Sequence, residues 1–207
     1  MDMLLNILTG MKHALLILFA YLIGSIPIGV LLARLKGKDP RKVGSGNIGA
    51  TNVMRSAGKV LGIITLIGDI LKGFLPTFIA IRLGEPDLFI ALVGLAVFSG
   101  HLFPVFLKFK GGKGVATGAG VYLAINPLAI LISFMIFVIV FLIWKYVSLG
   151  SLVGTGIIPL SFFLLKTPTE YILLSLLIAC GVFIKHKDNI KRLFAGTENK
   201  VNLCKKT

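Results

Sequence analysis

The sequence predicts an all-α fold, a polytopic helical bundle integral to a membrane, and three observations support this prediction. Of the 207 residues, 56% are hydrophobic and only 14% are charged, with a mean hydropathy of +0.95, whereas a soluble domain has about a quarter of its residues charged. The apolar residues gather in runs that approach or exceed the ~20 residues with which a helix crosses a bilayer. Alternating segments of about ten residues, the pattern of membrane β-strands, do not occur.

The first apolar run, 13–35, contains Gly24, Ser25, Pro27 and Gly29 in its second half, which predicts close helix packing and a kink. The later runs are separated by polar or turn-forming segments. They are 60–83, 88–107, 115–125, 128–146, 151–165 and 171–184. Each run counted as one crossing gives seven transmembrane helices. Fusion of the short pieces gives five, because such pieces are also compatible with re-entrant or buried segments.

The charge distribution predicts the orientation. Seventeen of the 22 lysines and arginines fall in the segments 34–59, 108–113 and 185–207, which places these segments on the cytoplasmic side. Since both counts of helices are odd, the N-terminus is expected outside and the C-terminus in the cytoplasm. With no linker or internal repeat, residues 1–207 are expected to form a single transmembrane domain.

The formal net charge of +14 does not indicate nucleic-acid binding, because the basic residues lie in loops between apolar runs. Membrane lipids with anionic headgroups and the positive-inside bias explain most of them. No metal site is expected, since the apolar runs hold no carboxylate cluster of the kind that metal-dependent phosphotransfer uses. The glycine-lysine segment near residue 113 is not a Walker motif, because Gly114 stands where Ser or Thr would follow Lys113.

The segment 44–55, here named loop one, reads GSGNIGATNVMR and precedes an apolar helix. Hydroxyl, amide and glycine groups at a helix start form a concavity that binds anions, and an arginine can hold a phosphate in a bidentate fork. A turn with a helix cap would also use such residues, but it needs only one of them. We therefore favour a ligand site. Its candidate residues are Ser45, Gly46, Asn47, Gly49, Thr51, Asn52 and Arg55.

The segment 108–118, here named loop two, reads KFKGGKGVATG and contains three lysines and four glycines. Glycines allow backbone N–H groups to approach a ligand, and lysines supply charge for phosphate, so a phosphate cradle at the membrane surface is expected. The alternative is a basic loop that only fixes the topology. His101 precedes it and has either a role in the site or a structural hydrogen bond. The candidate residues are His101, Lys108, Gly111, Gly112, Lys113, Gly114 and Thr117.

The segment 186–200, here named loop three, reads HKDNIKRLFAGTENK. A solvated basic tail that binds anionic headgroups is one interpretation. It does not explain His186 and Asn189, which lie three apart and so share one face of a helix. Asp69 and Lys72 are also three apart, inside an apolar run, and are expected to neutralise each other beside the site.

These residues alone allow two kinds of protein, a lipid-synthesising transferase or a carrier of a phosphorylated metabolite. Three motifs in register narrow the choice. Residues 45–52 (SGNIGATN), 100–117 (GHLFPVFLKFKGGKGVAT) and 186–200 closely resemble the three cytoplasmic motifs of the bacterial acyl-phosphate:glycerol-3-phosphate acyltransferases, the PlsY family. The order, spacing, chain length and expected topology also agree. No internal repeat of the kind common in transporters is found.

The resemblance implies transfer of a fatty acyl group from acyl phosphate to the 1-hydroxyl of glycerol 3-phosphate, giving lysophosphatidic acid and phosphate. It implies no metal, no cofactor and no coenzyme A thioester. It also implies a site at the cytoplasmic face of the bacterial inner membrane and, as a partner, the peripheral enzyme that makes acyl phosphate. The residues that it places in the polar site are Ser45, Thr51, Asn52, Arg55, Lys113, His186 and Asn189.

A base must take the proton from the glycerol hydroxyl. We expect this base to be either His186, oriented by Asn189, or a phosphate oxygen of a substrate, with Ser45 in a hydrogen-bonding role. Because acyl phosphate already has a good leaving group, the main task is to position two anions, and Arg55 and Lys113 are suited to it. The amides of 46–49 and 111–114 are expected to hold the oxyanion and the departing phosphate.

Overall fold

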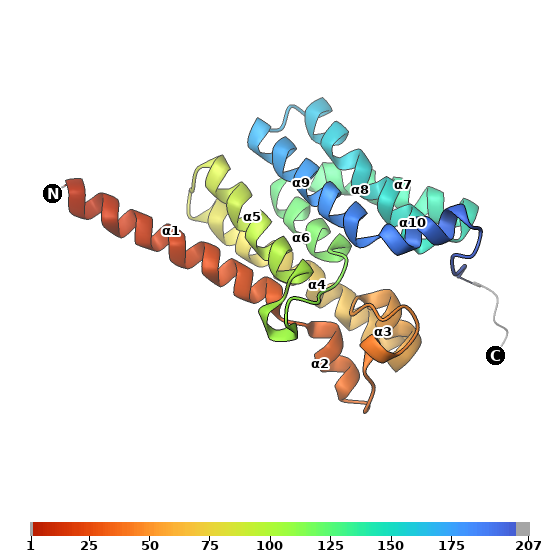
Figure 1. Cartoon of the computed structure of the whole chain (residues 1–207). Helices are drawn as coiled ribbons and strands as arrows, with labels where there is room; N and C mark the ends of the chain where they lie inside the picture. The colour runs from red at the N-terminus through yellow and green to blue at the C-terminus, as the bar shows by residue number, and fades with distance from the viewer. Residues whose placement is uncertain (1, 202–207) are drawn as a thin grey trace. The chain divides into compact units, whose positions relative to one another are not determined.

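The computed structural model describes residues 2–201, in which all regular structure is helical. Figure 1 shows the ten α-helices of this part of the chain. They are α1 (Asp2–Ser25), α2 (Ile28–Arg34), α3 (Ala50–Ala57), α4 (Lys59–Arg82), α5 (Asp87–Leu102), α6 (Val115–Ile125), α7 (Pro127–Trp144), α8 (Val147–Leu164), α9 (Thr169–Lys185) and α10 (Lys187–Phe194). Two short 3₁₀ helices, η1 (Pro40–Lys42) and η2 (Val105–Leu107), lie in the polar segments.

The helices form two compact units, one up to Ile125 and one from Asn126 onward. In the first unit α4 is the central helix, packed against α2, α3, α5 and α6, while α1 runs along α5 (Figure 1). The crossing of α4 and α6 is close because of glycine. A Cβ added to Gly73 would lie 2.1 Å from the Thr117 carbonyl oxygen, and one added to Gly120 would lie 2.0 Å from that of Ile70. Small residues therefore set this helix contact, as in other membrane bundles.

The kink expected in the first apolar run is confirmed. The helix breaks after Ser25 and resumes at Ile28, with Pro27 between the two parts. The expected start at residue 13 is wrong, because α1 begins at Asp2. Residues before the apolar run include Leu and Met, which favour helix, so the helix extends beyond the membrane-length pattern.

The polar segment 36–59 contains a helix that the apolar pattern did not predict. Helix α3 has eight residues and buries Asn52, Val53 and Ala57 on one face. Its mixed composition hides this amphipathic pattern from a search for apolar runs. Arg55 consequently lies on a helix and not in an extended loop.

In the second unit α8 packs against α7 and α9. The Ser133 hydroxyl of α7 donates to the Gly154 carbonyl of α8 at 2.7 Å. Asn126 caps α7 by accepting from the amides of Leu128 and Ala129. Helix α10 bends away from α9 by 62°, so the segment after 185, expected as a polar tail, begins with a helix.

Five helical segments of the described chain are long and apolar enough to cross a membrane, and the bent α9–α10 pair makes a sixth if it is one span. The five are Ile7–Arg34, Lys59–Arg82, Asp87–Leu107, Pro127–Trp144 and Val147–Leu164. Large apolar side chains such as Leu15, Phe134 and Ile143 are more than half exposed, which fits helices whose outer faces meet lipid.

Candidate active site

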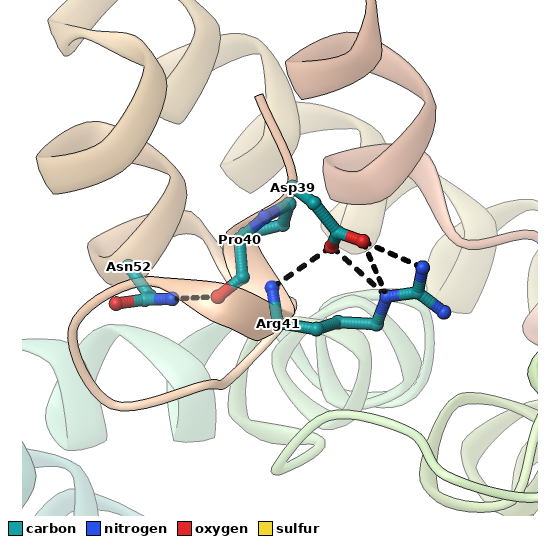
Figure 2. Close-up of polar contacts among 4 residues, drawn as sticks. All are labelled: Asp39, Pro40, Arg41 and Asn52. Atoms are coloured by element: carbon teal, nitrogen blue, oxygen red, sulfur yellow. Dashed lines mark hydrogen bonds and ion pairs between the residues drawn. The ribbon is translucent and has the colours of Figure 1, made fainter. Parts of the chain in front are cut away.

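Loop one is organised by the side chain of Asn52, which is 2% exposed. Its amide Nδ2 lies within hydrogen-bond distance of three carbonyl oxygens, those of Pro40 (2.7 Å), Asn47 (2.8 Å) and Val43 (3.0 Å). Its Oδ1 accepts from the Ser45 amide at 3.1 Å. Figure 2 shows the contact with Pro40. The polar atoms of the Asn52 side chain therefore bond to the backbone of loop one and of the residues just before it.

An ion pair lies at the approach to loop one (Figure 2). The Arg41 guanidinium donates to Asp39 through Nη2 at 2.7 Å and Nε at 2.9 Å, and the Arg41 amide donates to the same carboxylate. The side-chain hydrogen bond from Arg41 holds the pKa of Asp39 at about 2. Asp39 and Arg41 thus neutralise each other.

The remaining polar groups of loop one are more accessible. Ser45 and Gly46 are exposed, and Gly46 has a left-handed φ of 69°, which glycine adopts without strain. Thr51 is half-buried in the first turn of α3. Arg55 is exposed in its last turn, and no carboxylate among the described residues pairs with it. Arg55 is therefore available to an anion.

The approach to loop two is a strained turn. Lys108 and Phe109 have φ values of 51° and 63°, a left-handed conformation that is uncommon for residues other than glycine. The turn is held by the Phe109 amide, which donates to the Pro104 carbonyl at 2.9 Å. Strained backbone of this kind is frequent at functional sites. Lys108 itself is exposed.

His101 lies beneath loop two and is 4% exposed. Its carbonyl accepts from the Gly112 amide at 3.1 Å, and a Cβ on Gly112 would lie 2.2 Å from the His101 Nε2. The His101 Nδ1 is 3.7 Å from Asp69 Oδ1. These contacts place the His101 ring against the backbone of loop two.

The start of α6 offers hydrogen-bond donors. Gly114 is buried with a φ of 83°, and neither its N–H nor that of Gly111 donates to another group in the described chain. The Thr117 hydroxyl in the first turn is buried and has no hydrogen-bond partner within residues 2–201. Buried polar groups are nearly always paired in proteins. With half-buried Lys113 beside them and the positive end of the helix dipole, these donors suit an anion.

Loop three belongs to the second unit and centres on His186, which is 3% exposed between α9 and α10. The Nδ1 of His186 is 2.8 Å from the Val182 carbonyl oxygen. Because a carbonyl can only accept, this nitrogen carries the proton, and in the neutral ring Nε2 is the basic one. The Val182 carbonyl is thus one group that orients the His186 ring.

The polar groups of loop three are joined by Glu198, which the sequence analysis did not single out. Its Oε1 accepts from Asn189 (2.7 Å) and Ser148 (2.9 Å), and its Oε2 from Arg192 (2.7 Å). Burial raises the pKa of Glu198, but these hydrogen bonds outweigh it, so the pKa lies below its usual value. The one feature of the sequence that could have indicated Glu198 is that it is an acidic residue shortly after the basic helix α10.

The structure brings some predicted residues into contact. In the first unit the Asn52 side chain is hydrogen-bonded to the backbone of Ser45 and Asn47, and the His101 carbonyl is hydrogen-bonded to the Gly112 amide. In the second unit Asn189 meets Glu198. Within residues 2–201 no three His, Cys, Asp or Glu side chains cluster in a way that could hold a metal ion.

Comparison with known proteins identifies the family. The family model described as "Glycerol-3-phosphate acyltransferase" matches residues 14–196. The chain belongs to this family. Curated glycerol-3-phosphate acyltransferases from Trichlorobacter lovleyi and Geobacter sulfurreducens are 52% and 46% identical to it, over 87% and 92% of this chain and 93% and 98% of theirs. The family predicted from the three motifs is confirmed.

A solved structure agrees with this assignment. The crystal structure of PlsY, an integral membrane glycerol 3-phosphate acyltransferase, in its glycerol 3-phosphate form is 42% identical to this chain with a TM-score of 0.90. The match covers 92% of this chain and 96% of PlsY. Together with the five apolar helical segments, it confirms the prediction of an all-α integral membrane protein.

Proposed function

We propose that this protein transfers a fatty acyl group from acyl phosphate to the 1-hydroxyl of sn-glycerol 3-phosphate, giving lysophosphatidic acid and inorganic phosphate. One observation carries the proposal, namely the match of nearly the whole chain to proteins named glycerol-3-phosphate acyltransferase. The solved PlsY structures, described as the glycerol 3-phosphate and lysophosphatidic acid forms, fit a substrate and a product of this reaction.

The reaction needs positioning more than acid catalysis. The glycerol 1-oxygen attacks the acyl carbonyl carbon, the new C–O ester bond forms, and the C–O bond to phosphate breaks. The bonding electrons leave with phosphate, and the hydroxyl proton passes to a base. Since both substrates are anions, the protein must hold them together against their repulsion and stabilise the oxyanion that forms.

The donors of loop two and the start of α6 form the proposed phosphate cradle. The N–H groups of Gly111 and Gly114, the Thr117 hydroxyl and Lys113 supply neutral and charged donors. The amide of Gly112 is not part of the cradle, because it bonds to the His101 carbonyl. Lys108 adds positive charge at the edge.

Loop one supplies the second set of anion-binding groups. Arg55, which has no carboxylate partner among the described residues, is the candidate for the charged contact, with Ser45 and Thr51 as hydroxyl donors. Gly46, Asn47 and Gly49 shape the loop. Asn52 acts by holding the loop, since its polar atoms bond to the backbone.

The base is His186 or a substrate phosphate oxygen. A neutral His186 whose Nδ1–H is donated to Val182 has a basic Nε2, which supports the histidine version. Asn189, which donates to Glu198 at 2.7 Å, is the residue proposed to orient His186. In the histidine version, His186→Gln lowers kcat by about 100-fold or more, and near-normal turnover would exclude that version.

The finer topology is also part of the proposal. We place seven membrane helices in the bacterial cytoplasmic membrane, with the N-terminus outside and the three loops and the C-terminus in the cytoplasm. Helix α6 has 11 residues, which span about 16 Å, less than the ~30 Å hydrocarbon core. The choice between seven and five depends on this helix and on the bent α9–α10 pair, because five other segments are long and apolar enough to cross alone. Labelling of single cysteines placed at the exposed positions 10, 45, 110 and 197, with Cys180 and Cys204 replaced by serine, from either side of sealed vesicles tests the orientation.

Acyl phosphate and a peripheral enzyme that makes it are the proposed partners. No metal and no coenzyme A thioester take part. The test is phosphate release by purified protein given palmitoyl phosphate and glycerol 3-phosphate in EDTA. Release that needs both substrates, with lysophosphatidic acid formed, supports the transferase. No release, combined with uptake of glycerol 3-phosphate into vesicles without acyl phosphate, would instead support a transporter.

A further inference from the structure

Three ionisable side chains are buried together in the membrane-spanning helices of the first unit. Asp69 and Lys72 of α4 and His101 of α5 have side chains that are each 4% exposed. The Asp69 Oδ1 is 2.9 Å from Lys72 Nζ and 3.7 Å from His101 Nδ1. Ionisable groups in a membrane are energetically unfavourable and tend to be functional. We name these three residues the Asp69 cluster.

One arm of the Asp69 cluster reaches the backbone that leads to loop one. Lys72 Nζ donates to the Ile26 carbonyl oxygen at 3.0 Å. Ile26 lies at the break between α1 and α2, where carbonyl groups fall outside the regular helical hydrogen bonding. Because α2 begins two residues later and packs against α3, this bond ties Lys72 to the backbone from which the chain continues toward loop one.

The other arm reaches loop two. The His101 carbonyl accepts from the Gly112 amide at 3.1 Å, and its ring lies so close that a Cβ on Gly112 would be 2.2 Å from Nε2. The Asp69 Oδ1, 3.7 Å from the Nδ1 of that ring, therefore lies beside the residue that contacts Gly112. One carboxylate is thus linked to the supports of both anion-binding loops.

Stability alone does not account for such a cluster. A buried ion pair replaced by apolar residues of similar volume often leaves a protein equally or more stable. What the pair supplies here is a defined position for two backbone segments. In a reaction between two bound anions, small displacements of their binding loops strongly affect the rate.

We infer that Asp69, Lys72 and His101 are positioning residues that hold loop one and loop two at the separation needed for acyl transfer. They act through the Ile26 carbonyl and the Gly112 amide and do not themselves hold substrate. This inference rests on the proposed acyltransferase function.

The test compares Asp69→Asn and Asp69→Glu with Glu85→Gln. Glu85 is a matched control, because it also pairs with a lysine and a histidine, Lys12 and His13, in the same unit. For each protein in lipid nanodiscs, kcat and KM are measured for palmitoyl phosphate and glycerol 3-phosphate. Hydrogen exchange of the backbone amides of loops one and two and the melting temperature are measured on the same samples.

We expect Asp69→Asn to lower kcat/KM by about 100-fold and to speed exchange at Gly112 and in loop one. Asp69→Glu, which keeps the charge, is expected to recover part of the activity, and Glu85→Gln to keep wild-type kcat/KM and exchange. If Asp69→Asn lowers only the melting temperature, with kcat/KM and loop exchange unchanged, the cluster is structural and the inference is wrong.

If Asp69→Asn does not fold, the double variant Asp69→Asn/Lys72→Met removes both charges and leaves no buried lysine unpaired. It is expected to fold and to show the same loss of kcat/KM, and normal kcat/KM would overturn the inference. Failure of the proposed function is distinguishable, because the wild-type protein itself would then form no lysophosphatidic acid. In that case the exchange rates of the two loops still decide whether Asp69 holds them.

Discussion

The first unit contains two clusters with the same three kinds of side chain, and they differ in what they hold. In one, Glu85 pairs with Lys12 and with His13, whose Nε2 is 2.8 Å from Glu85 Oε2. In the other, Asp69 pairs with Lys72 and His101. Lys12 is 50% and His13 31% exposed at the side chain, whereas all three side chains of the Asp69 cluster are 4% exposed.

The Glu85 cluster joins α1 to the turn between α4 and α5 through side chains, and its His13 ring stacks on Phe89 with centroids 4.0 Å apart. The Lys12 side chain is half-exposed, although the Glu85 side chain itself is 5% exposed. The Asp69 cluster contacts backbone instead, because Lys72 donates to the Ile26 carbonyl and the His101 carbonyl accepts from the Gly112 amide. A carboxylate, a lysine and a histidine therefore do not define a role by themselves. Their burial and their backbone partners do.

The two clusters are expected to differ most in the stability that the protein loses when the lysine of each is replaced. Lys72→Met leaves the Asp69 carboxylate buried without its lysine, and breaking a buried pair in this way destabilises a protein by about 3–5 kcal/mol. Lys12→Met removes a half-exposed partner and leaves Glu85 bonded to His13, so it should destabilise the protein less than Lys72→Met does. Unfolding in detergent micelles measures both. Equal losses would mean that the two clusters contribute alike.

A second comparison between the two clusters uses a glycine beside each one, replaced by alanine. Gly112→Ala places a Cβ against the His101 ring, so loop two must move, and we expect kcat/KM to fall about 100-fold. Gly84→Ala, next to Glu85, meets open space but has a φ of 70°, so it should cost about 1–2 kcal/mol in stability and leave kcat/KM unchanged. Steady-state kinetics at equal folded concentration decide it. Wild-type kinetics for Gly112→Ala would contradict the close packing.

Loop one offers a similar comparison between two asparagines that organise backbone. Asn52→Ala leaves buried backbone groups of loop one unpaired, which costs about 1–3 kcal/mol and should lower kcat/KM. Asn126→Ala removes the cap of α7 and should cost about 1 kcal/mol with normal kcat/KM. The two variants are compared by melting temperature and by kinetics. Normal kinetics for Asn52→Ala would mean that catalysis does not depend on the hydrogen bonds by which Asn52 orders loop one.

The smallest effect is a dependence of stability on pH. Hydrogen bonds from Lys12 and then His13 lower the pKa of Glu85 below 4.5 in the folded protein. The stability that Glu85 contributes is therefore complete above pH 4.5 and is lost as the pH falls through the lowered pKa. Melting temperatures of the wild type and Glu85→Gln should converge as the pH falls below 4.5. A constant difference would mean that Glu85 does not titrate in this range.

Much of the fold could be predicted from the sequence, because membrane helices consist of long apolar runs that are visible in it. The limits of α4 and α6 fall within one residue of those expected, and the break at Pro27 follows from proline chemistry. Helix α3 was missed because it is short and amphipathic, whereas a helix at α10 was considered from the spacing of His186 and Asn189. The extension of α1 to Asp2 was missed because it lies outside the apolar run.

The candidate site was predictable in its residue types and less so in their roles. A motif shows that Asn52 matters, but only coordinates show that its amide bonds to Pro40, Val43 and Asn47. Glu198 could not be placed, since its partners Ser148 and Asn189 lie up to 50 residues away in the chain. The link from Asp69 to Gly112 through His101 also depends on contacts between distant segments.

The most direct test of the central claim, that loop two holds a substrate phosphate, is the kinetics of Lys113→Ala beside Lys12→Ala. Loss of a charged hydrogen bond to phosphate predicts that Lys113→Ala lowers kcat/KM by about 10- to 100-fold, with a raised KM for one of the two substrates, while Lys12→Ala matches the wild type. Unchanged kcat and KM for both substrates in Lys113→Ala would contradict the account.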